Sequence, residues 1–374
     1  MKFSVGIIEP VGGHGGMDYY DYGLALGLSE NNVNVVLYTS NETKIRNYQN
    51  VTTKLFFNNM WKSNFIIKVL KYLFGHYFAI KDLKKRDIKI LHLHFFKLRL
   101  IDLFIIKLAK FHGLIVIGTL HDINAFDKKA NKLVEKKCIN FLDGIIVHNQ
   151  SSLNSLNKKQ KLKSSIKIIP HGNYLPFLDK TKFKSLKNDD KLKLLFFGQI
   201  KKVKGLKTLL EAMKILKDAD QKIELVIAGK AWKSDLNVYT ELISKLNISE
   251  IVKTNFSYIP DSEVSNYFNS ADLIVLPYTK IYQSGVLLLS MSYGKPVICS
   301  DLDPFKEIII DNENGFLFQS ENEIDLAKKI IDIIEKNKLS SVTENANALI
   351  SSKFDWINIG KTTKEFYTNL LNNN

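Results

Sequence analysis

The sequence predicts an α/β protein with two doubly wound domains, each a parallel sheet with crossover helices. Short apolar segments alternate with helical patterns in two separate runs, which is the element order of such sheets. A polar, lysine-rich stretch without strong periodicity, residues 179–191, lies between the two runs. The length of 374 residues also suits two cores of ordinary size better than one.

The apolar segments of the first run predict strands at residues 3–8, 33–39, 89–95, 115–120, 144–148 and 166–169. Those of the second run, which opens with LKLLFFG, predict strands at residues 192–198, 223–229, 252–259, 272–278 and 296–301. We therefore expect a first domain at 1–175, a linker at 176–191, a second domain at 192–355 and a C-terminal helix at 356–374 that packs back on the first domain. Two such domains place the loops at their strand carboxyl ends around a shared cleft.

Composition excludes several classes of protein. The 45% hydrophobic and 24% charged content is that of a globular chain. Charged residues interrupt the most apolar region, so no membrane-spanning helix is expected, and the opening MKFSVGIIEP indicates a first strand rather than a signal peptide. Cys138 and Cys299 lie far apart in apolar patterns, which gives no disulfide framework and no metal spacing. We expect a cytoplasmic protein with reduced thiols.

The net charge of +15 favours anionic partners, whether nucleic acid, a phospholipid surface or a phosphorylated substrate. A general bias towards lysine and asparagine is the alternative explanation. The chain has no zinc-ligand spacing, no RNP-like aromatic motif and no helix-turn-helix with a basic recognition helix. Nucleic acid is therefore not an expected partner.

Residues 61–110 combine basic and apolar side chains. This segment holds twelve Lys or Arg against three Asp, interleaved with residues such as Trp61, Phe65, Phe74 and Phe78. The combination is typical of an interfacial helix on an anionic membrane, which would make the protein peripheral on the inner face of the cell membrane. The alternative is a helix whose apolar face packs on the sheet while its lysines point to water.

The first expected strand is followed by VGGHGG, in which Gly13, His14, Gly15 and Gly16 precede a helical pattern. Glycine frees φ and lets another molecule approach the backbone. The segment is either a tight strand-to-helix turn or a loop whose N–H groups meet a phosphate or an acceptor sugar. Its spacing is not G-x-G-x-x-G, so an NAD-dependent dehydrogenase is not supported.

The second domain opens with FFGQIKKVKG, where a strand ends at Gly198 and Lys204 and Gly205 start an amphipathic helix. Lys201 and Lys204 then stand beside a helix N-terminus, where both the dipole and the side-chain charge favour a phosphate. The alternative is a solvated basic turn.

A second helix start follows the expected strand DLIVLPY. Gln283, Ser284 and Gly285 lead into an apolar helix that begins at Val286. A buried helix needs partners for its first N–H groups, and a diphosphate would supply them. Capping by the Ser284 hydroxyl is the alternative, and the two are compatible.

Together these segments resemble the retaining, GT-B-fold glycosyltransferases of family 4 (glycosyltransferase group 1). The resemblance covers nearly the whole chain and rests on GGHGG, TLHD (119–122), IIPHG (168–172), FGQIKKVKG and ADLIVLPY…QSGVLLLSMSYGKPVI. It implies the GT-B fold and a nucleoside-diphosphate-sugar donor. By resemblance, Lys204 matches the lysine that holds the donor diphosphate, and His121 matches a strand-end histidine near the reacting sugar. A structural histidine under a loop is the alternative for His121.

Two positions depart from the pattern of this family. Gln199 stands where a basic residue is common, and Lys201 would compensate for it. The usual pair of glutamates around the donor has no counterpart, because no Glu occurs between Glu263 and Glu307 and Leu289 stands where the second would fall. This departure concerns the ribose contact and the choice of sugar, and it leaves the diphosphate site intact.

The resemblance implies a hexosyltransferase that moves a sugar with retention to a saccharide or lipid-linked saccharide acceptor, in cell-surface polysaccharide or glycolipid synthesis. Two helix N-termini with Lys204 and Lys201 would stabilise the departing diphosphate, so neither a metal nor another cofactor is expected. Alternatives from other classes are a nucleotide-sugar epimerase of the same fold and a non-catalytic protein that binds anionic ligands.

Overall fold

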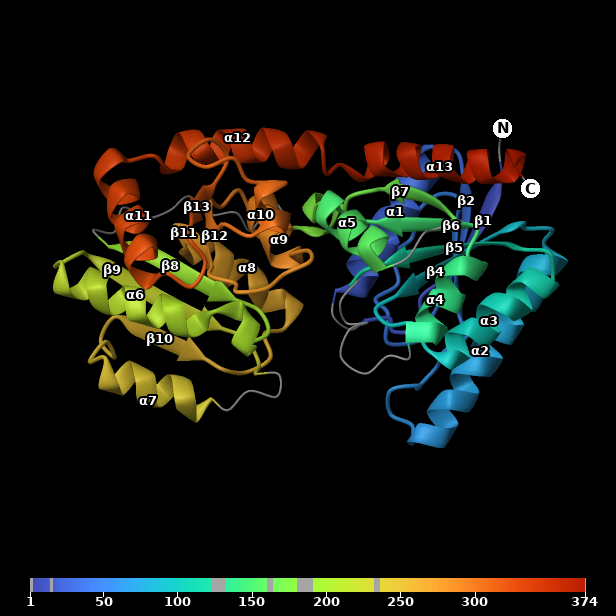
Figure 1. Cartoon of the computed structure of the whole chain (residues 1–374), viewed down its shortest axis with the longest axis horizontal. Helices are drawn as coiled ribbons and strands as arrows, with labels where there is room; N and C mark the ends of the chain where they lie inside the picture. Colours follow the sequence, from blue (N-terminus) through green and yellow to red (C-terminus); the bar gives the residue numbers. More distant parts are fainter. Residues whose placement is uncertain are drawn as a thin grey trace. The chain divides into compact units, whose positions relative to one another are not determined.

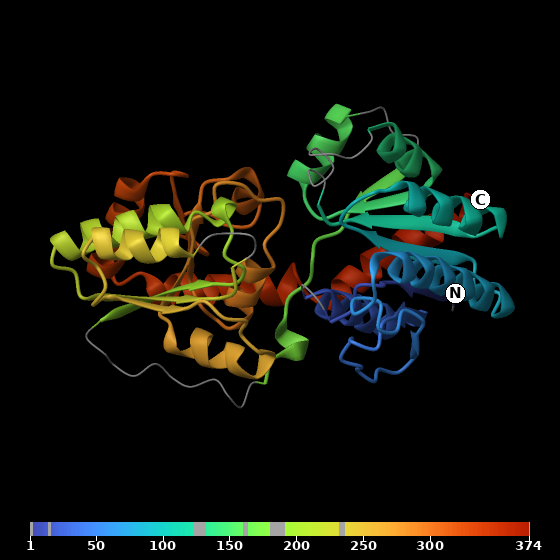
Figure 2. The same ribbon diagram turned by 90° about the horizontal axis from the view of Figure 1, so that it is seen from below.

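The computed structural model describes residues 3–13, 16–122, 132–159, 164–179, 191–231 and 236–373 (Figure 1). The chain forms two compact units. Unit 1 consists of Met1–Gly172 and Phe354–Asn374, and unit 2 consists of Asn173–Lys353. Each unit is a parallel sheet with helices on both faces (Figures 1 and 2). The prediction of two doubly wound α/β domains is therefore confirmed.

Unit 1 has the strand order β3-β2-β1-β4-β5-β6-β7. Its strands are β1 (Ser4–Ile8), β2 (Asn34–Thr39), β3 (Val51–Leu55), β4 (Ile90–Phe95), β5 (Ile115–Leu120), β6 (Gly144–Val147) and β7 (Ser165–Ile168). Its helices are α1 (Met17–Glu30), α2 (Phe65–Lys85), α3 (Leu100–Phe111), α4 (Lys132–Phe141), α5 (Gln150–Lys159) and α13 (Trp356–Asn372). Sequence analysis did not predict β3, because the VTTKL sequence of this edge strand is half polar and incompletely buried.

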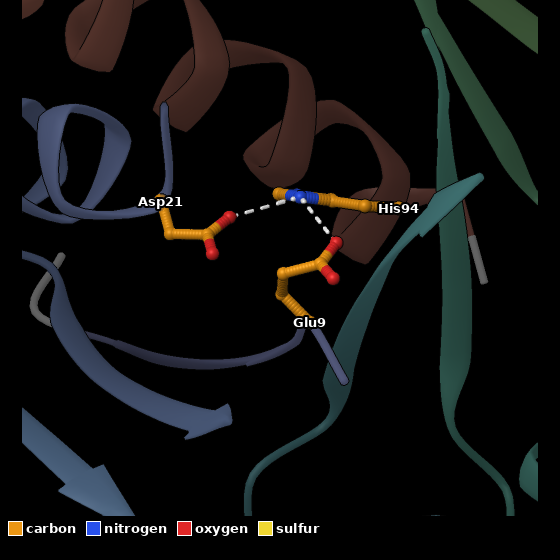
Figure 3. Close-up of side chains that lie close together, drawn as sticks. All are labelled: Glu9, Asp21 and His94. Carbon is orange, nitrogen blue, oxygen red and sulfur yellow. Dashed lines mark ion pairs between the residues drawn. The ribbon is translucent and has the colours of Figure 1, made fainter. Parts of the chain in front are cut away.

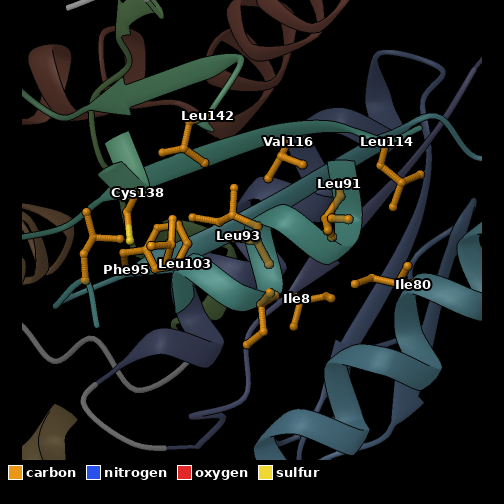
Figure 4. Close-up of a cluster of buried hydrophobic side chains, with 14 of the residues drawn as sticks. Ile8, Ile80, Leu91, Leu93, Phe95, Leu103, Leu114, Val116, Cys138 and Leu142 are labelled. Carbon is orange, nitrogen blue, oxygen red and sulfur yellow. The ribbon is translucent and has the colours of Figure 1, made fainter. Parts of the chain in front are cut away.

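Strand β4 shows how the sequence of unit 1 divides the two faces of the sheet. In its sequence ILHLHF the side chains alternate between faces. Leu91, Leu93 and Phe95 belong to the apolar cluster with residues of α2 and α3 (Figure 4). His92 and His94 point the other way, where His92 hydrogen-bonds to a tyrosine of α13. On this second face the histidines of β4 lie beside buried apolar residues of the neighbouring strands, such as Ile7 and Ile117.

Unit 2 has the strand order β10-β9-β8-β11-β12-β13. Its strands are β8 (Leu192–Phe197), β9 (Ile223–Ala228), β10 (Val252–Asn255), β11 (Leu273–Leu276), β12 (Val297–Ser300) and β13 (Phe316–Phe318). Its α-helices are α6 (Leu206–Asp218), α7 (Asn237–Lys245), α8 (Asp261–Ser270), α9 (Gly285–Ser292), α10 (Asp303–Lys306), α11 (Glu323–Lys336) and α12 (Leu339–Ser352), and its 3₁₀ turns are η1 (Leu175–Phe177) and η3 (Lys202–Lys204). Strand β13 was not predicted, because the three residues of FLF are too few for a strand pattern.

The strand order reverses once in each sheet, between β1 and β4 in unit 1 and between β8 and β11 in unit 2. Ligands of open α/β sheets bind outside the carboxyl ends of the strands at such a switch point. In unit 1 the C-terminal helix α13 packs on α1, where the backbones of Gly27 and Gly360 meet so closely that an added Cβ on Gly360 would lie 2.1 Å from Gly27. These two glycines therefore have a packing role.

Candidate active site

The switch point of unit 2 is formed by the loops after β8 and β11, and two glycines hold these loops together. Gly198 and Gly205 have φ angles of +107° and +66°, a region that favours glycine. A Cβ on Gly205 would lie 1.6 Å from the carbonyl oxygen of Pro277, and one on Gly198 would lie 3.3 Å from Val286. The first loop therefore contacts the second at both of its ends.

Lys204 projects from the first of these loops. Its ammonium lies 3.6 Å from the centre of the Tyr278 ring, and it makes no ion pair with any residue that the structure describes. The Tyr278 side chain is buried, and its hydroxyl has no hydrogen-bond partner in the described part of the chain. Lys201 lies at the start of η3 and is half-buried. The Lys204 ammonium therefore lies over an aromatic ring beside the start of α6, and no carboxylate among the described residues pairs with it.

The second loop leads into α9 and provides the other helix start. The Ser284 hydroxyl accepts a hydrogen bond from the Leu287 N–H at 3.1 Å, so capping by Ser284 is present. One hydroxyl satisfies only one of the four N–H groups that a helix start leaves unpaired. Beside it, Gln283 Oε1 is buried without a hydrogen-bond partner in the described residues. Leu289, half-buried in α9, offers no polar group there.

The structure thus brings together Gly198, Lys204, Gly285 and Val286 from two distant segments of sequence. Sequence analysis proposed these residues, together with Lys201, Gln283 and Ser284, for donor binding. Their positions suit an anionic ligand, and their binding role stays a prediction. Tyr278 was missed, because one tyrosine after an apolar strand carries no signal in sequence.

The carboxyl edge of the unit 1 sheet is built from histidines. His94 lies near the end of β4, and His121, His148 and His171 follow β5, β6 and β7. Their rings form a row. The ring centroids are 5.3 Å apart between His94 and His121, 5.0 Å apart between His121 and His148, and 6.2 Å apart between His148 and His171. The ring of Tyr20 from α1 packs edge-on against the first three, 4.8 Å from His121.

Hydrogen bonds determine the tautomers of two of these rings. His148 Nδ1 lies 2.9 Å from the carbonyl oxygen of Ile169, which can only accept, so Nδ1 carries the proton. Nε2 of neutral His148 must then accept a hydrogen bond from Nδ1–H of His121, 3.2 Å away. His121 Nε2 is left with a free lone pair, and it has no hydrogen-bond partner in the described residues. His121 is therefore oriented to accept a hydrogen bond from a hydroxyl.

Burial keeps these rings uncharged near neutral pH. It lowers the pKa of His148 to about 3, with the charge of His171 as a smaller cause. It lowers the pKa of His121 well below its ordinary value, and the neighbouring histidines lower it further. Neutral rings are what the tautomer assignment requires.

The glycine-rich loop of unit 1 has a structural explanation for part of its composition. Gly12 and Gly13 have φ angles of +33° and +63°, and a Cβ on Gly13 would lie 2.2 Å from the carbonyl oxygen of Glu42. Gly16 opens α1 with a φ of 78° and without a side-chain cap. His14 and Gly15 lie outside the described residues. The tight-turn interpretation therefore accounts for Gly13, while Gly16 begins α1 without a side-chain cap.

Several residues of this edge were not predicted from the sequence. His148 and His171 were not proposed, although each follows an apolar strand as His121 does, and neither was His94, which lies within β4. Glu9 and Asp21, fully buried acids close to His94, were also missed. A usable signal was that Glu9 directly follows the apolar run SVGII, which puts a charged side chain at the carboxyl end of an expected strand.

The two units together define an α/β protein with glycine turns and two helix starts at the edge of one sheet and histidines at the edge of the other. Two family models match the chain: "Glycosyltransferase Family 4" over residues 14–173 and "Glycosyl transferases group 1" over residues 178–349. The chain belongs to the family 4 glycosyltransferases with the GT-B fold.

Curated relatives match over part of their length. An uncharacterized glycosyltransferase of Methanocaldococcus jannaschii is 26% identical over 66% of this chain and 62% of its own. The lipopolysaccharide 1,2-N-acetylglucosaminetransferase of Salmonella typhimurium is 22% identical over 60% and 61%. The GDP-mannose:glycolipid 4-beta-D-mannosyltransferase of Xanthomonas campestris is 28% identical over 42% and 44%. The matched part of the chain thus spans less than two thirds of each of these relatives.

Solved structures match over the whole chain. Sucrose-phosphate synthase from Thermosynechococcus elongatus has a TM-score of 0.78 at 17% identity and covers 100% of both chains. Anabaena HepE in complex with UDP and glucose has a TM-score of 0.72 at 16% identity, with 98% of this chain and 100% of that chain covered. These likenesses show the two-domain GT-B fold.

Proposed function

We propose that this protein is a hexosyltransferase that moves a sugar, with retention, from a nucleoside diphosphate sugar to a saccharide or lipid-linked saccharide acceptor in cell-surface polysaccharide or glycolipid synthesis. The observation that carries the proposal is the switch point of unit 2. There Lys204 and the starts of α6 and α9 meet, and two buried polar atoms, Tyr278 Oη and Gln283 Oε1, have no hydrogen-bond partner in the described residues.

A donor diphosphate would match these groups. Helix starts attract anions through their unpaired N–H groups and the helix dipole. The Lys204 ammonium would add a charge-assisted contact to the leaving diphosphate. HepE, which has this fold, is described in complex with UDP and glucose, which supports the choice of a nucleotide-linked donor.

The leaving diphosphate would be stabilised by protein groups without a metal. Asp301 and Asp303 follow β12 with a D-x-D spacing that sequence analysis overlooked. Asp301 is engaged, because it accepts a hydrogen bond from the Ser320 N–H at 2.9 Å and lies 3.5 Å from the Lys306 ammonium. The cationic character of the site therefore comes from Lys204, Lys201 and the helix starts.

We assign His121 to the reacting sugar. Its free Nε2 lone pair would accept a hydrogen bond from a sugar hydroxyl and so fix the position of that sugar. Retention would proceed by attack on the same face from which the diphosphate leaves, with a phosphate oxygen taking the acceptor proton.

The acceptor side would rest on an anionic membrane on the cytoplasmic side, where a lipid-linked acceptor is found. We call the exposed apolar and basic residues of α2, α3 and the turns before them the α2–α3 surface. Its apolar members are Trp61, Phe65, Ile66, Ile67, Leu70, Phe74, Tyr77, Phe78, Leu100, Phe104 and Phe111. Its exposed basic members are Lys62, Lys81, Lys84, Lys85, Lys97, Arg99 and Lys107.

The burial of α2 favours this docking over packing on the sheet. The buried residues of α2 are Gly75, His76, Ala79, Ile80 and Leu83, all in its second half. In Figure 1 its first half extends beyond α3, and Phe65 there is 80% exposed. Basic residues around exposed apolar side chains are what an anionic lipid surface attracts. No helix in the described part of the chain is long and apolar enough to span a membrane.

The proposal is tested by titrating UDP, GDP, ADP, CDP and dTDP and their hexose conjugates into the purified protein by calorimetry. We expect one nucleoside diphosphate to bind, and its sugar conjugate to be consumed with an anomerically retained product once a membrane extract supplies the acceptor. Failure of every nucleotide to bind, or epimerisation of the donor sugar without transfer, would contradict the proposal.

A further inference from the structure

Three buried side chains converge at the switch point of unit 1. Glu9 follows β1, His94 lies near the end of β4, and Asp21 faces them from α1 (Figure 3). His94 Nδ1 lies 3.1 Å from Asp21 Oδ1 and 3.8 Å from Glu9 Oε2. All three side chains have no exposed surface. Their donor atoms all lie within 4.8 Å of one another, and no other group of this kind occurs among the described residues.

The polar atoms in this cluster lack hydrogen bonds. Glu9 Oε2, both Asp21 oxygens and both His94 nitrogens have no hydrogen-bond partner in the part of the chain that the structure describes. A polar atom that is buried without a partner destabilises the folded chain. The other oxygen of Glu9 is satisfied, because Oε1 accepts a hydrogen bond from the Val11 N–H at 2.6 Å. Three of the unsatisfied atoms, one from each residue, therefore lie close together: Glu9 Oε2, Asp21 Oδ1 and His94 Nδ1.

The charges of the three groups point to what would fill this centre. Glu9 and Asp21 each offer a carboxylate oxygen, and His94 offers a ring nitrogen that has no hydrogen-bond partner in the described residues. Two ionised carboxylates beside a neutral imidazole would leave two negative charges that a dication balances, and metal binding itself favours these deprotonated forms.

We propose that Glu9 Oε2, Asp21 Oδ1 and His94 Nδ1 bind one first-row divalent cation such as Zn²⁺ or Mn²⁺. Ligand atoms about 2.1 Å from such an ion lie roughly 3.0–4.2 Å apart, a range that contains the distances of 3.1 Å and 3.8 Å. A ligand set of one imidazole and two carboxylates binds these divalent ions better than it binds a soft monovalent ion.

The ion would organise the edge of unit 1 rather than the donor site of unit 2. Glu9 binds it with one oxygen and holds the Val11 N–H with the other. The cation would therefore fix the first turn of the glycine-rich loop relative to β4 and α1. This site is independent of the proposed donor site, because none of its ligands belongs to unit 2.

The test is the metal content of the purified full chain. Protein purified without chelators is incubated with Zn²⁺, Mn²⁺, Co²⁺, Mg²⁺ or Ca²⁺, passed through gel filtration and analysed by plasma mass spectrometry. We expect one Zn²⁺ or Mn²⁺ per chain in the wild type. Glu9→Gln and Asp21→Asn each remove a ligand charge while keeping the side-chain shape, so we expect at least roughly 100-fold weaker binding in both. Asp18→Asn, which changes another buried acid of α1, is the matched control and should keep the ion.

Anomalous diffraction at the absorption edge of the bound metal gives a second measurement that needs no variant. A peak between the three side chains is the expected result. A wild-type protein without a stoichiometric first-row ion would overturn the proposal, as would a peak elsewhere or equal metal content in Glu9→Gln and Asp21→Asn. In that case the three groups share protons instead of a cation.

Discussion

The two sheets share one strand order over six strands, to which unit 1 adds a seventh, but their carboxyl edges carry different residues. In unit 1, four neighbouring strands each have a histidine at or near their carboxyl end, and buried acids join them at the switch point. In unit 2, the edge consists of glycine turns, helix starts and Lys204 on an aromatic ring. The first edge holds a row of buried histidine rings, and the second holds a lysine beside two helix starts. The same doubly wound framework thus carries different residues at its strand ends, and we expect different roles for the two edges.

The two units also differ on their outer surfaces, because we propose that only the α2–α3 surface of unit 1 binds a membrane. The largest expected effect is therefore on liposome binding. Changing Lys81, Lys84 and Lys85 of α2 to Glu should weaken binding to anionic liposomes by about a thousandfold. Each basic group is worth roughly 1 kcal/mol near such a surface, and charge reversal adds repulsion. Liposome sedimentation at low and high salt measures this.

The matched control for the membrane prediction makes the same charge change in unit 2. Lys207, Lys245 and Lys328 are exposed on α6, α7 and α11, and their conversion to Glu should leave liposome binding within about threefold. Equal loss in both variants would mean that net charge, and not the α2–α3 surface, drives binding. Absence of wild-type binding at low salt would remove the membrane from the proposed function.

The second expected effect concerns the role assigned to the unit 1 edge. His121→Ala should lower kcat by about a hundredfold or more while donor affinity changes little, because the lost contact positions the reacting sugar. Single-turnover kinetics and donor titration separate the two quantities. His76→Ala is the control, since His76 is equally buried in unit 1 but lies on α2. If both variants lose stability and neither loses kcat selectively, His121 is structural.

The third effect tests the unit 2 edge by itself. Lys204→Ala should reduce kcat/KM for the donor by about 30- to 150-fold, the loss of a charge-assisted contact worth roughly 2–3 kcal/mol. Lys207→Ala, in the first turn of α6, removes an exposed lysine whose ion pair within the described residues is with Glu211, and it should have no such effect. Near wild-type turnover of Lys204→Ala at subsaturating donor contradicts the assignment.

A smaller effect is expected from His148, which we expect to act on turnover through His121 and not through the sugar. His148→Phe removes the acceptor that fixes the His121 tautomer, so kcat should fall by about tenfold with donor KM unchanged. His148→Gln can still accept from His121 and should restore most of the activity. If Gln is no better than Phe, the tautomer has no influence on turnover and His148 acts only by packing.

The sequence predicted the unit 2 edge better than the unit 1 edge, for a physical reason. Gly198, Lys204 and Ser284 belong to short contiguous segments, in which a strand end and a helix start are visible within about ten residues. Glu9, Asp21 and His94 come from two strands and a helix that only the folded sheet brings together. Their contact depends on strand order, which periodicity does not reveal.

Strand boundaries show the same limit. Most expected strands agree with the structure within two residues, because buried parallel strands are nearly continuous apolar runs. Strands β3 and β13 were missed, since both lie at sheet edges, where one side of the strand has no neighbour and an apolar run is not needed. The exposure of the first half of α2 also could not be predicted, because an apolar helix gives the same pattern whether it faces a sheet or a membrane.

The smallest expected effect is that of divalent metals on donor binding, for which we expect no change. Because we propose that Lys204 and the helix starts stabilise the donor diphosphate, donor binding should not require a divalent metal. Calorimetric affinity for the cognate nucleoside diphosphate should agree within about twofold in EDTA and in excess Mg²⁺ or Mn²⁺. The cation proposed for unit 1 does not affect this measurement, since it is made on donor binding rather than on turnover, and Glu9→Gln should give the same donor affinity. A tenfold or greater gain in nucleotide affinity with added metal would show that a metal binds together with the diphosphate in unit 2. Asp301 and Asp303 after β12 would then be the first residues to replace.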